Sequence, residues 1–262
     1  MEFVKHEYDA TDEQRREYTI TTTMPLYNEQ GLLRLEGYMT LFNNVVEEHL
    51  PNVTCSIPSM IERWNVSWAL LSNHIYINRV PEQNEVLTAH TWCSEIKRMF
   101  FMRDIEFTDA DGEVVFGGAT TSALVDLAKR EMLTSGEVYD AMVFENGPKY
   151  YPDRVKLQTR GYDLEPIGSV TVQPSWLDPL GHMNNTRYPE VFYNNVSEET
   201  RAKYARLKDF EIHWQQEMNL GEEILLQLCE TDTEAVMCGY KKEADGKPGH
   251  LAFAGKMVFG EA

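Results

Sequence analysis

The chain has 262 residues, of which 42% are hydrophobic and 25% charged, a composition typical of a folded protein with one or two cores. Its 24 lysines and arginines against 42 aspartates and glutamates give a formal net charge of −18, which opposes binding to nucleic acid or to an anionic membrane surface. The sequence has no apolar run long enough to span a bilayer and no signal-peptide core. We therefore expect a cytoplasmic protein without membrane insertion, with its four cysteines reduced.

In the first half of the chain, the pattern of apolar residues predicts one long helix and an antiparallel sheet. β-Branched and aromatic residues at positions 17–24 indicate a strand. Apolar residues then recur three and four apart over residues 31–50, which predicts a helix that Pro51 ends. Four strand-like runs follow, with a hairpin turn at residues 109–112 between the last two: 64–80, 85–94, 98–108 and 113–127.

The periodicity is lost between residues 129 and 166, which predicts a crossing segment or linker. We therefore expect domains at residues 1–130 and 167–262, joined by residues 131–166. The second half repeats the order of the first, with a strand at 168–174, a polar loop, and a helix that has Pro189 in its first turn and ends near Tyr204. Four strand-like runs complete the chain: 210–219, 222–230, 234–243 and 250–259.

Local sequence matches between the halves indicate a duplicated domain. Residues 42–48 in the first predicted helix resemble residues 192–199 in the second. Residues 84–87 match 221–224 at an offset of 137, and residues 110–112 match 244–246 at an offset of 134. Because the predicted elements also follow the same order, duplication is the better interpretation than coincidence between short polar strings.

A candidate site lies in the loop before the second helix, where polar residues gather in one copy only. Asp178, His182, Asn184 and Asn185 lie in residues 176–185, and the corresponding residues 26–33 contain no histidine. Backbone N–H groups at a helix amino terminus suit a developing oxyanion. The alternative is structural: Asp178 caps a turn, His182 is a half-buried polar residue, and one of the asparagines is an N-cap.

Glu217 is a second candidate, because the offset of 137 places it opposite Val80 of the first copy. If residues 210–219 form a strand, Glu211, His213, Gln215 and Glu217 share one face. Should that face meet the 176–185 loop, two carboxylates and an imidazole would converge and could activate water for acyl transfer without a cofactor. The alternative is a solvated carboxylate.

Other chemistries have less support in the sequence. It lacks the G-x-S-x-G, GxxxxGK[ST] and GxGxxG patterns, which argues against hydrolase-fold, P-loop and dinucleotide sites. A zinc or iron site made of Asp178, His182, His213 and Glu217 is chemically feasible. We expect no metal, because no HxxxH or CxxC pair anchors such a site.

Four runs of residues, taken in order, carry a resemblance that spans nearly the whole chain. They are residues 80–92 (VPEQNEVLTAHTW), 98–105 (RMFFMRDI), 178–188 (DPLGHMNNTRY) and 212–217 (IHWQQE). They resemble the strand pair, the active-site loop and the glutamate-bearing strand of acyl-ACP thioesterases, where ACP is acyl carrier protein. The resemblance implies an α+β fold, a tandem double hot-dog in which a curved antiparallel sheet wraps each long helix.

The resemblance also implies an activity: hydrolysis of fatty acyl-ACP thioesters, which releases free fatty acid and carrier protein and ends chain elongation. It implies no cofactor. Asp178, His182 and Glu217 match the family's catalytic residues. We expect backbone N–H groups near the start of the second helix to polarise the thioester carbonyl. The substrate-binding candidates are Gly181, Met183, Asn184 and Asn185, and the residues expected to line the acyl-chain pocket in the first half are Leu35, Met39 and Phe42.

One position departs from the family pattern and keeps alternatives open. Plant members have an asparagine two residues before the histidine, and this chain has Leu180. The loop is closer to that of single hot-dog acyl-CoA thioesterases, in which the aspartate is itself base or nucleophile. Asp178 or Glu217 could therefore be the base, and acyl-CoA could be the substrate. A hot-dog protein that binds acyl thioesters without cleaving them is a further alternative, and both monomer and homodimer are compatible with tandem copies.

The net charge of −18 opposes the approach of an acidic carrier protein unless basic residues cluster locally. Two groups of basic residues are candidate docking sites. For the group near the end of the second helix, compensation of the helix dipole is the alternative. The groups are Arg154, Lys156 and Arg160 in the crossing segment, and Arg201, Lys203, Arg206 and Lys208 at the helix end.

Overall fold

A computed structural model describes residues 16–142, 149–151 and 156–261 of the protein. The chain divides into two compact units, one formed by Met1–Leu33 and Tyr38–Arg154, the other by Arg34–Gly37 and Val155–Ala262. The division falls inside the segment where the sequence periodicity is lost. Within the described residues, no helix is both long and apolar enough to cross a membrane.

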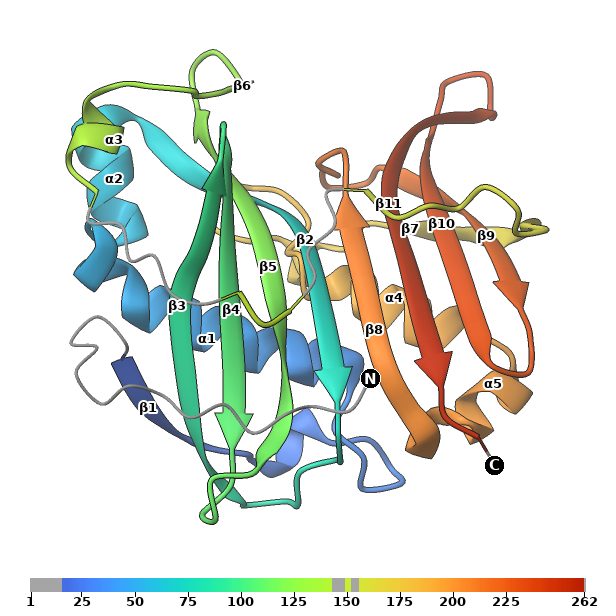
Figure 1. The fold of residues 1–262 in the computed structure, drawn as a ribbon. Coiled ribbons are helices and arrows are strands. Elements are labelled where there is room, and N and C mark those ends of the chain that lie inside the picture. Colours follow the sequence, from blue (N-terminus) through green and yellow to red (C-terminus); the bar gives the residue numbers. More distant parts are fainter. Residues whose placement is uncertain (1–15, 143–148, 152–155, 262) are drawn as a thin grey trace. The chain divides into compact units, whose positions relative to one another are not determined.

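The first unit contains five main strands in the antiparallel order β1-β3-β4-β5-β2 (Figure 1). The short strand β6 (Glu131–Met132) pairs with β5. The other elements of the unit, in chain order, are β1 (Arg16–Thr21), the 3-10 helix η1 (Met24–Leu26), α1 (Leu35–Val53), α2 (Ile57–Trp64), β2 (Val66–Ile77), β3 (Val86–Lys97), β4 (Phe100–Thr108), β5 (Val114–Asp126) and α3 (Glu137–Asp140).

Aromatic packing between α1 and the strands forms the centre of this unit. The ring of Phe42 on α1 stacks on Phe107 of β4, with 5.6 Å between centroids, and Phe107 stacks on Phe116 of β5 at 4.3 Å. Tyr38, one helical turn before Phe42, meets Phe116 edge-on at 5.0 Å. Aromatic rings bury large apolar areas, so these contacts hold α1 on one face of the sheet (Figure 1).

The second unit has the strand order β7-β9-β10-β11-β8, in which each strand is the counterpart of the strand at the same place in the order of the first unit. Ring contacts again join helix and sheet, because Phe192 of α4 packs on Phe210 of β8. This agreement confirms the predicted tandem double hot-dog. The elements are β7 (Glu165–Thr171), η2 (Pro174–Trp176), α4 (Arg187–Asn195), α5 (Glu198–Ala202), η3 (Tyr204–Arg206), β8 (Leu207–Trp214), β9 (Glu223–Glu230), β10 (Glu234–Lys242) and β11 (Pro248–Phe259).

The matched sequence strings occupy matched places in the two units. Residues 110–112 form the turn between β4 and β5, where the N–H of Asp109 donates to the carbonyl of Glu113 at 3.0 Å. Residues 244–246 form the turn between β10 and β11, where the N–H of Glu243 donates to the carbonyl of Lys247 at 2.9 Å. The same turn thus closes the same hairpin in both copies.

Both predicted helices end differently in the structure, and the short helices α2 and α3 were not predicted. Pro51 lies inside α1, which continues to Val53; proline removes an N–H donor, but its fixed φ is helical and allows the last turn to form. The predicted helix from Pro189 to Tyr204 is interrupted, since α4 ends at Asn195 and the hydroxyl of Ser197 accepts the N–H of Thr200 to cap α5. Pro189 does lie in the first turn of α4, as expected.

Candidate active site

Asp178 closes a compact loop that presents His182. The N–H of Asp178 donates to the carbonyl of His182 at 2.8 Å, and the N–H of Gly181 donates to the carbonyl of Asp178 at 3.0 Å. The Oδ1 atom of Asp178 also accepts the N–H groups of Leu180 at 2.8 Å and His182 at 3.2 Å. Gly181 has a φ of +85°, which favours glycine. The turn-capping role considered for Asp178 is therefore present.

The first unit contains the same loop without the histidine. The Oδ1 atom of Asn28 accepts the N–H groups of Gln30 and Leu32, at 3.0 and 2.9 Å. Gly31 has a φ of +74°, and the N–H of Asn28 donates to the carbonyl of Leu32 at 2.8 Å. An uncharged amide thus does in one copy what the Asp178 carboxylate does in the other, and leucine takes the place of His182.

Glu217 lies in the loop after β8, because β8 ends at Trp214. The predicted strand over residues 210–219 is therefore wrong at its end. The N–H groups of Gln215 and Gln216 both point to the carbonyl of Ala252, at 2.9 and 3.4 Å, so the regular ladder stops there. Asn78 and Arg79 make the same pair of bonds to Val115 after β2, which shows that both copies end this strand alike.

The loop of Glu217 is fastened to the loop of His182 by backbone contacts. The N–H of Met183 donates to the carbonyl of Met218 at 2.8 Å, and His182 forms an isolated β-bridge with Asn219. The Nε2 atom of His182 lies 3.2 Å from the Oε2 atom of Glu217. The side chain of His182 is 20% exposed and that of Glu217 is 57% exposed. The structure thus brings an imidazole and a solvent-accessible carboxylate together.

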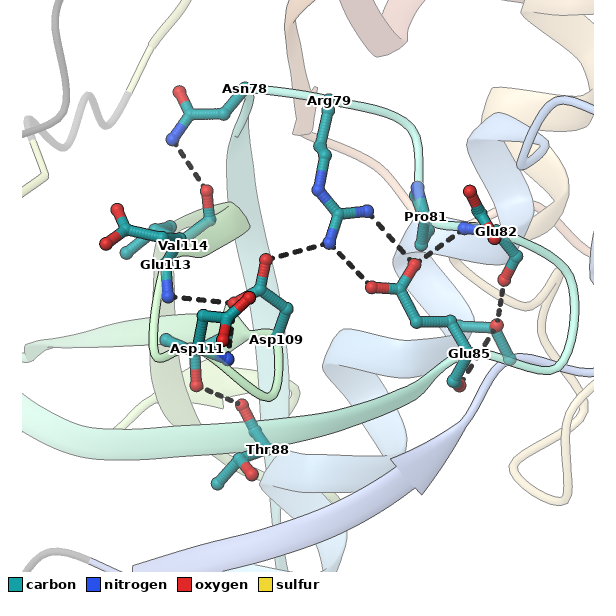
Figure 2. Close-up of polar contacts among 12 residues, drawn as sticks. Asn78, Arg79, Pro81, Glu82, Glu85, Thr88, Asp109, Asp111, Glu113 and Val114 are labelled. Carbon is teal, nitrogen blue, oxygen red and sulfur yellow. Dashed lines mark hydrogen bonds and ion pairs between the residues drawn. The ribbon is translucent and has the colours of Figure 1, made fainter.

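The corresponding loop of the first unit lacks this pair and is closed by its own ion pairs (Figure 2). Val80 stands where Glu217 stands in the second unit. Arg79 binds both oxygens of Glu85, at 3.0 and 2.6 Å, and Asp109 at 3.0 Å. Glu85 also accepts the N–H of Glu82 at 2.7 Å. Of these two corresponding pairs of loops, only those of the second unit bring an imidazole and a carboxylate together.

The amino end of α4 is occupied mostly by hydrogen bonds within the protein. Asn184 accepts the N–H and hydroxyl of Thr186 at 2.9 and 2.7 Å, so it organises the turn before α4. The N–H groups of Gly181, Met183 and Asn184 donate to the carbonyls of Asp178, Met218 and Trp176, respectively. These three N–H groups are therefore engaged in the structure, contrary to the expectation that they face the thioester carbonyl. Asn185, at the start of α4, is half-buried.

His213 pairs with a different carboxylate, that of Glu211. Its Nε2 atom lies 2.7 Å from Oε1 of Glu211, and both side chains are almost fully buried on β8. Of the polar face predicted for this strand, Glu211 and His213 are thus buried, whereas Gln215 and Glu217 lie beyond the end of β8 and are exposed. Across the described part of the chain, no cluster of three or more His, Cys, Asp or Glu residues could hold a metal ion.

The other predicted residues fall into two groups. The acyl-chain candidates Leu35, Met39 and Phe42 lie on α1 and are fully buried. Three basic residues near the end of the second predicted helix contact groups within the same unit. Lys203 forms an ion pair with Glu199 at 3.1 Å. The side chain of Arg201 donates to the carbonyl of Val196, and that of Arg206 donates to the carbonyl of Gly260. Lys156, Arg160 and Lys208 are within the described residues, and Arg154 lies outside them.

Comparison with known proteins relates the chain to one family. The family model "Acyl-ACP thioesterase N-terminal domain" matches residues 12–140, and "Acyl-ACP thioesterase C-terminal domain" matches residues 165–255. No curated protein matches the chain.

Two solved structures share the fold over nearly their full lengths. An acyl-ACP thioesterase from Bacteroides thetaiotaomicron is 22% identical, with a TM-score of 0.76, and the match covers 94% of this chain and 98% of that one. The 12:0-ACP thioesterase from Umbellularia californica is 13% identical, with a TM-score of 0.74 and coverage of 94% and 97%. Since models of both family domains match in order, this chain belongs to the acyl-ACP thioesterase family.

Proposed function

We propose that Glu217, His182 and Asp178 form the active site at which this thioester hydrolase cleaves fatty acyl-ACP. Membership of the family makes the protein a hydrolase that releases free fatty acid from acyl-ACP. The observation that carries the assignment of residues is the 3.2 Å contact between His182 and Glu217. It occurs in one unit of a duplicated fold, at a position where the other unit has Leu32 and Val80.

Glu217 is the better candidate for the general base. Asp178 uses Oδ1 to hold two backbone N–H groups of its own loop, and Asn28 does the same with a side chain that cannot take a proton. The loop therefore needs an acceptor at this position but no charge. The Glu217 side chain is 57% exposed, and His182 contacts one oxygen of its carboxylate, which leaves the other oxygen able to reach a water molecule.

The reaction then proceeds by attack of water on the thioester carbonyl. The Nε2–H group of His182 donates to Oε2 of Glu217, and Oε1 takes a proton as the water oxygen bonds to the carbonyl carbon. The positive end of the α4 dipole, with Asn185 beside it, stabilises the negative charge on the carbonyl oxygen, since the N–H groups of Gly181, Met183 and Asn184 are already engaged. When the C–S bond breaks, the thiolate takes the proton from Glu217, which gives a fatty acid and the carrier thiol.

Thiol release by the purified protein tests the assignment directly. Glu217→Gln should lower kcat by about 10²–10⁴, whereas Asp178→Asn should lower it by less than about tenfold, because the amide can still hold the loop. Glu82→Gln, in the corresponding loop of the first unit, is the control and should keep the parent rate. Equal losses in the Asp178 and Glu217 variants would make Asp178 an alternative base, and parent rates in both would refute the site.

The contact between His182 and Glu217 also favours hydrolysis of acyl thioesters over binding without cleavage. A protein that only senses acyl thioesters has no need of an exposed carboxylate held by an imidazole. Mass spectrometry of acyl-ACP and acyl-CoA incubated with the protein should show loss of the acyl group, faster from acyl-ACP. Release from acyl-CoA alone would favour the acyl-CoA thioesterase alternative.

We further propose that the acyl chain binds against α1 of the first domain and that the protein acts in the cytoplasm. Leu35, Met39 and Phe42 are fully buried, so an acyl chain that reaches them displaces side-chain packing. Met39→Ala should therefore shift the preferred acyl length upward, since it removes three heavy atoms from the helix face. An unchanged length profile would place the chain elsewhere.

Docking of the carrier is proposed to involve Lys156 and Arg160. The double variant Lys156→Ala/Arg160→Ala should raise KM for acyl-ACP a few-fold, and the difference from the parent should shrink as salt is added. Lys247→Ala is the control, since Lys247 already pairs with Asp245 at 3.0 Å. A KM that neither the variant nor salt changes would contradict this docking site.

A further inference from the structure

Glu222, directly before β9, closes a turn in the loop of Glu217, and the sequence analysis did not single it out. One oxygen of its carboxylate, Oε2, accepts the N–H of Asn219 at 2.8 Å. In return, the N–H of Glu222 donates to the carbonyl of Asn219 at 3.1 Å. These two reciprocal bonds hold the turn of residues 219–222, which begins two residues after the proposed base.

The turn lies at the point where the two loops of the site are joined. Asn219 forms the β-bridge with His182, so Glu222 holds the residue that links the loops. Glu217 belongs to the same segment, and its carboxylate contacts the imidazole at 3.2 Å. A movement of the turn would therefore change the distance between the base and the imidazole.

The second oxygen of Glu222 is held by a cation from the neighbouring strand. The Nζ atom of Lys241 on β10 donates to Oε1 of Glu222 at 2.5 Å. The two side chains are only 26% and 24% exposed, so water screens the pair in part. Burial opposes the charge of Glu222, but the hydrogen bonds from Lys241 and from the N–H of Asn219 outweigh it and hold the pKa of the carboxyl below its usual range. Both oxygens of a charged carboxylate are thus engaged.

The first unit closes its corresponding turn with the same carboxylate but a different cation (Figure 2). Glu85 lies at the offset of 137 from Glu222. It accepts the N–H of Glu82 at 2.7 Å, and its own N–H donates to the carbonyl of Glu82 at 3.1 Å. The cation there is Arg79, which belongs to the loop itself and binds both oxygens of Glu85. The turn is therefore built in the same way in both copies, and each copy adds a positive charge to it.

The cation has a different origin in the unit that contains the proposed base. Arg79 directly precedes Val80, whereas the neutral Gln216 directly precedes Glu217. An arginine at position 216 would place a positive charge in the same loop as the base, and a nearby positive charge lowers the pKa of a carboxyl and makes it a weaker base. Lys241 supplies the charge from β10 instead, so the turn is held while the residue before the base stays neutral.

We propose that Glu222 and Lys241 are positioning residues for hydrolysis. Their ion pair fixes the turn at Asn219 and so keeps Glu217 at the distance from His182 that the reaction requires. This inference rests on the proposed role of Glu217 as the base. A base displaced by about 1 Å can lose up to about 10² in rate. Because the pair acts through the backbone of the loop, it should affect turnover more than the binding of substrate.

Kinetics of thiol release from acyl-ACP test the inference. Glu222→Ala should lower kcat by about 10- to 100-fold, with KM within about twofold of the parent. Lys241→Ala leaves the carboxylate in place and should lower kcat less, by about tenfold. Lys241→Arg should restore most of the parent kcat, since an arginine holds the equivalent carboxylate in the first unit.

Lys242→Ala is the matched control for the loss of an ion pair. Lys242 pairs with Glu223 at 2.7 Å, next along the chain from Lys241 and Glu222. Glu223 also accepts the hydroxyl of Ser169 on β7, so this pair links strands of the sheet. Lys242→Ala should keep the parent kcat. Equal losses in Lys242→Ala and Lys241→Ala would overturn the inference, because turnover would then depend on the sheet and not on the turn.

A double variant shows whether Glu222 acts through Glu217. In Glu222→Ala/Glu217→Gln, kcat should be no lower than in Glu217→Gln alone. A loss that adds fully would overturn the inference, as would a parent kcat in Glu222→Ala or a change confined to KM. None of these results would affect the proposed function, which fails only if Glu217→Gln itself keeps its rate. Should Glu222→Ala not fold, Lys241→Ala decides the question, and a parent kcat in that variant would refute the inference.

Discussion

The Nε2 atom of His182 lies 3.2 Å from the Oε2 atom of Glu217, and the two residues come from separate loops that are joined through their backbones. The N–H of Met183 donates to the carbonyl of Met218, and His182 forms a β-bridge with Asn219. Because these contacts do not involve the side chains of His182 or Glu217, either side chain can be replaced without loss of the loop geometry. The site can therefore be dissected by substitution.

His182→Leu should abolish most hydrolysis while leaving the fold intact. Leucine occupies the equivalent position in the first unit, where Leu32 makes the same backbone bonds in the same type of loop. We expect kcat to fall by at least about 10² and the melting temperature to change little. Thiol release and thermal unfolding measure the two effects. The reverse change, Leu32→His, should alter neither, and a large loss of activity in that variant would contradict the division of roles between the units.

Asp178 should reveal its loop-capping role in stability measurements. Asp178→Ala leaves the N–H groups of Leu180 and His182 without their acceptor, at a cost of about 1–2 kcal/mol in the free energy of unfolding. Asp178→Asn should cost much less, since Asn28 forms the same two bonds in the first unit. Chemical denaturation of the two variants measures the difference. Equal destabilisation would mean that the charge of Asp178, and not its acceptor oxygen, holds the loop.

Gly181→Ala and Gly31→Ala are matched substitutions that distinguish an effect of backbone strain on stability from an effect on catalysis. Both glycines have positive φ, +85° and +74°, and a Cβ added to either meets no atom within 4 Å. Each substitution should therefore cost a similar amount, about 1 kcal/mol, from backbone conformation alone. Only Gly181→Ala should lower kcat, because only its loop carries the histidine. Similar kcat values in both variants would show that turnover does not depend on the shape of the 178–182 loop.

Much of this architecture could be predicted because, in a duplicated fold, the sequence pattern of each element occurs twice. The order of the elements along the chain, the paired hairpin turns and the loop of Asp178 and His182 all follow from local patterns that recur in both halves. The end of β8 could not be predicted, since it depends on the carbonyl of Ala252 accepting two successive N–H groups. Apart from Gln216, the apolar-polar alternation runs from Phe210 to Met218. The sequence alone therefore places Glu217 on the strand, although it lies in a loop.

Contacts between segments that are distant in the chain could also not be predicted from the sequence. The β-bridge between His182 and Asn219 joins two loops, and no local pattern marks it. The continuation of α1 past Pro51 and the cap at Ser197 depend on local geometry that residue types allow but do not require. In each case tertiary contacts determine which of several local conformations forms, because the residues have similar intrinsic propensity for each of them.

Two buried carboxyl groups on β4 should make the stability of the first unit depend on pH. Asp104 and Glu106 are fully buried. Asp104 accepts the hydroxyl of Ser94 at 2.8 Å and the N–H groups of Tyr150 and Tyr151 at 2.7 and 3.1 Å, and the hydroxyl of Tyr151 donates to Glu106 at 2.9 Å. Burial raises the pKa of Asp104 to about 6 and that of Glu106 to about 7.

Glu106→Gln tests the larger of these effects. The unfolded chain loses the Glu106 proton near its ordinary pKa of 4.5, whereas the folded chain keeps it to about 7. Between these values the folded state binds more protons, so its stability falls as pH rises, by up to about 3 kcal/mol. Glutamine cannot ionise, and its carbonyl still accepts from Tyr151. Thermal unfolding should therefore show the variant gaining on the parent as pH rises from about 5 to about 8, whereas Glu131→Gln, at an exposed site on β6, should follow the parent. A constant difference between Glu106→Gln and the parent across this range would show that Glu106 is charged in the folded protein at every pH tested.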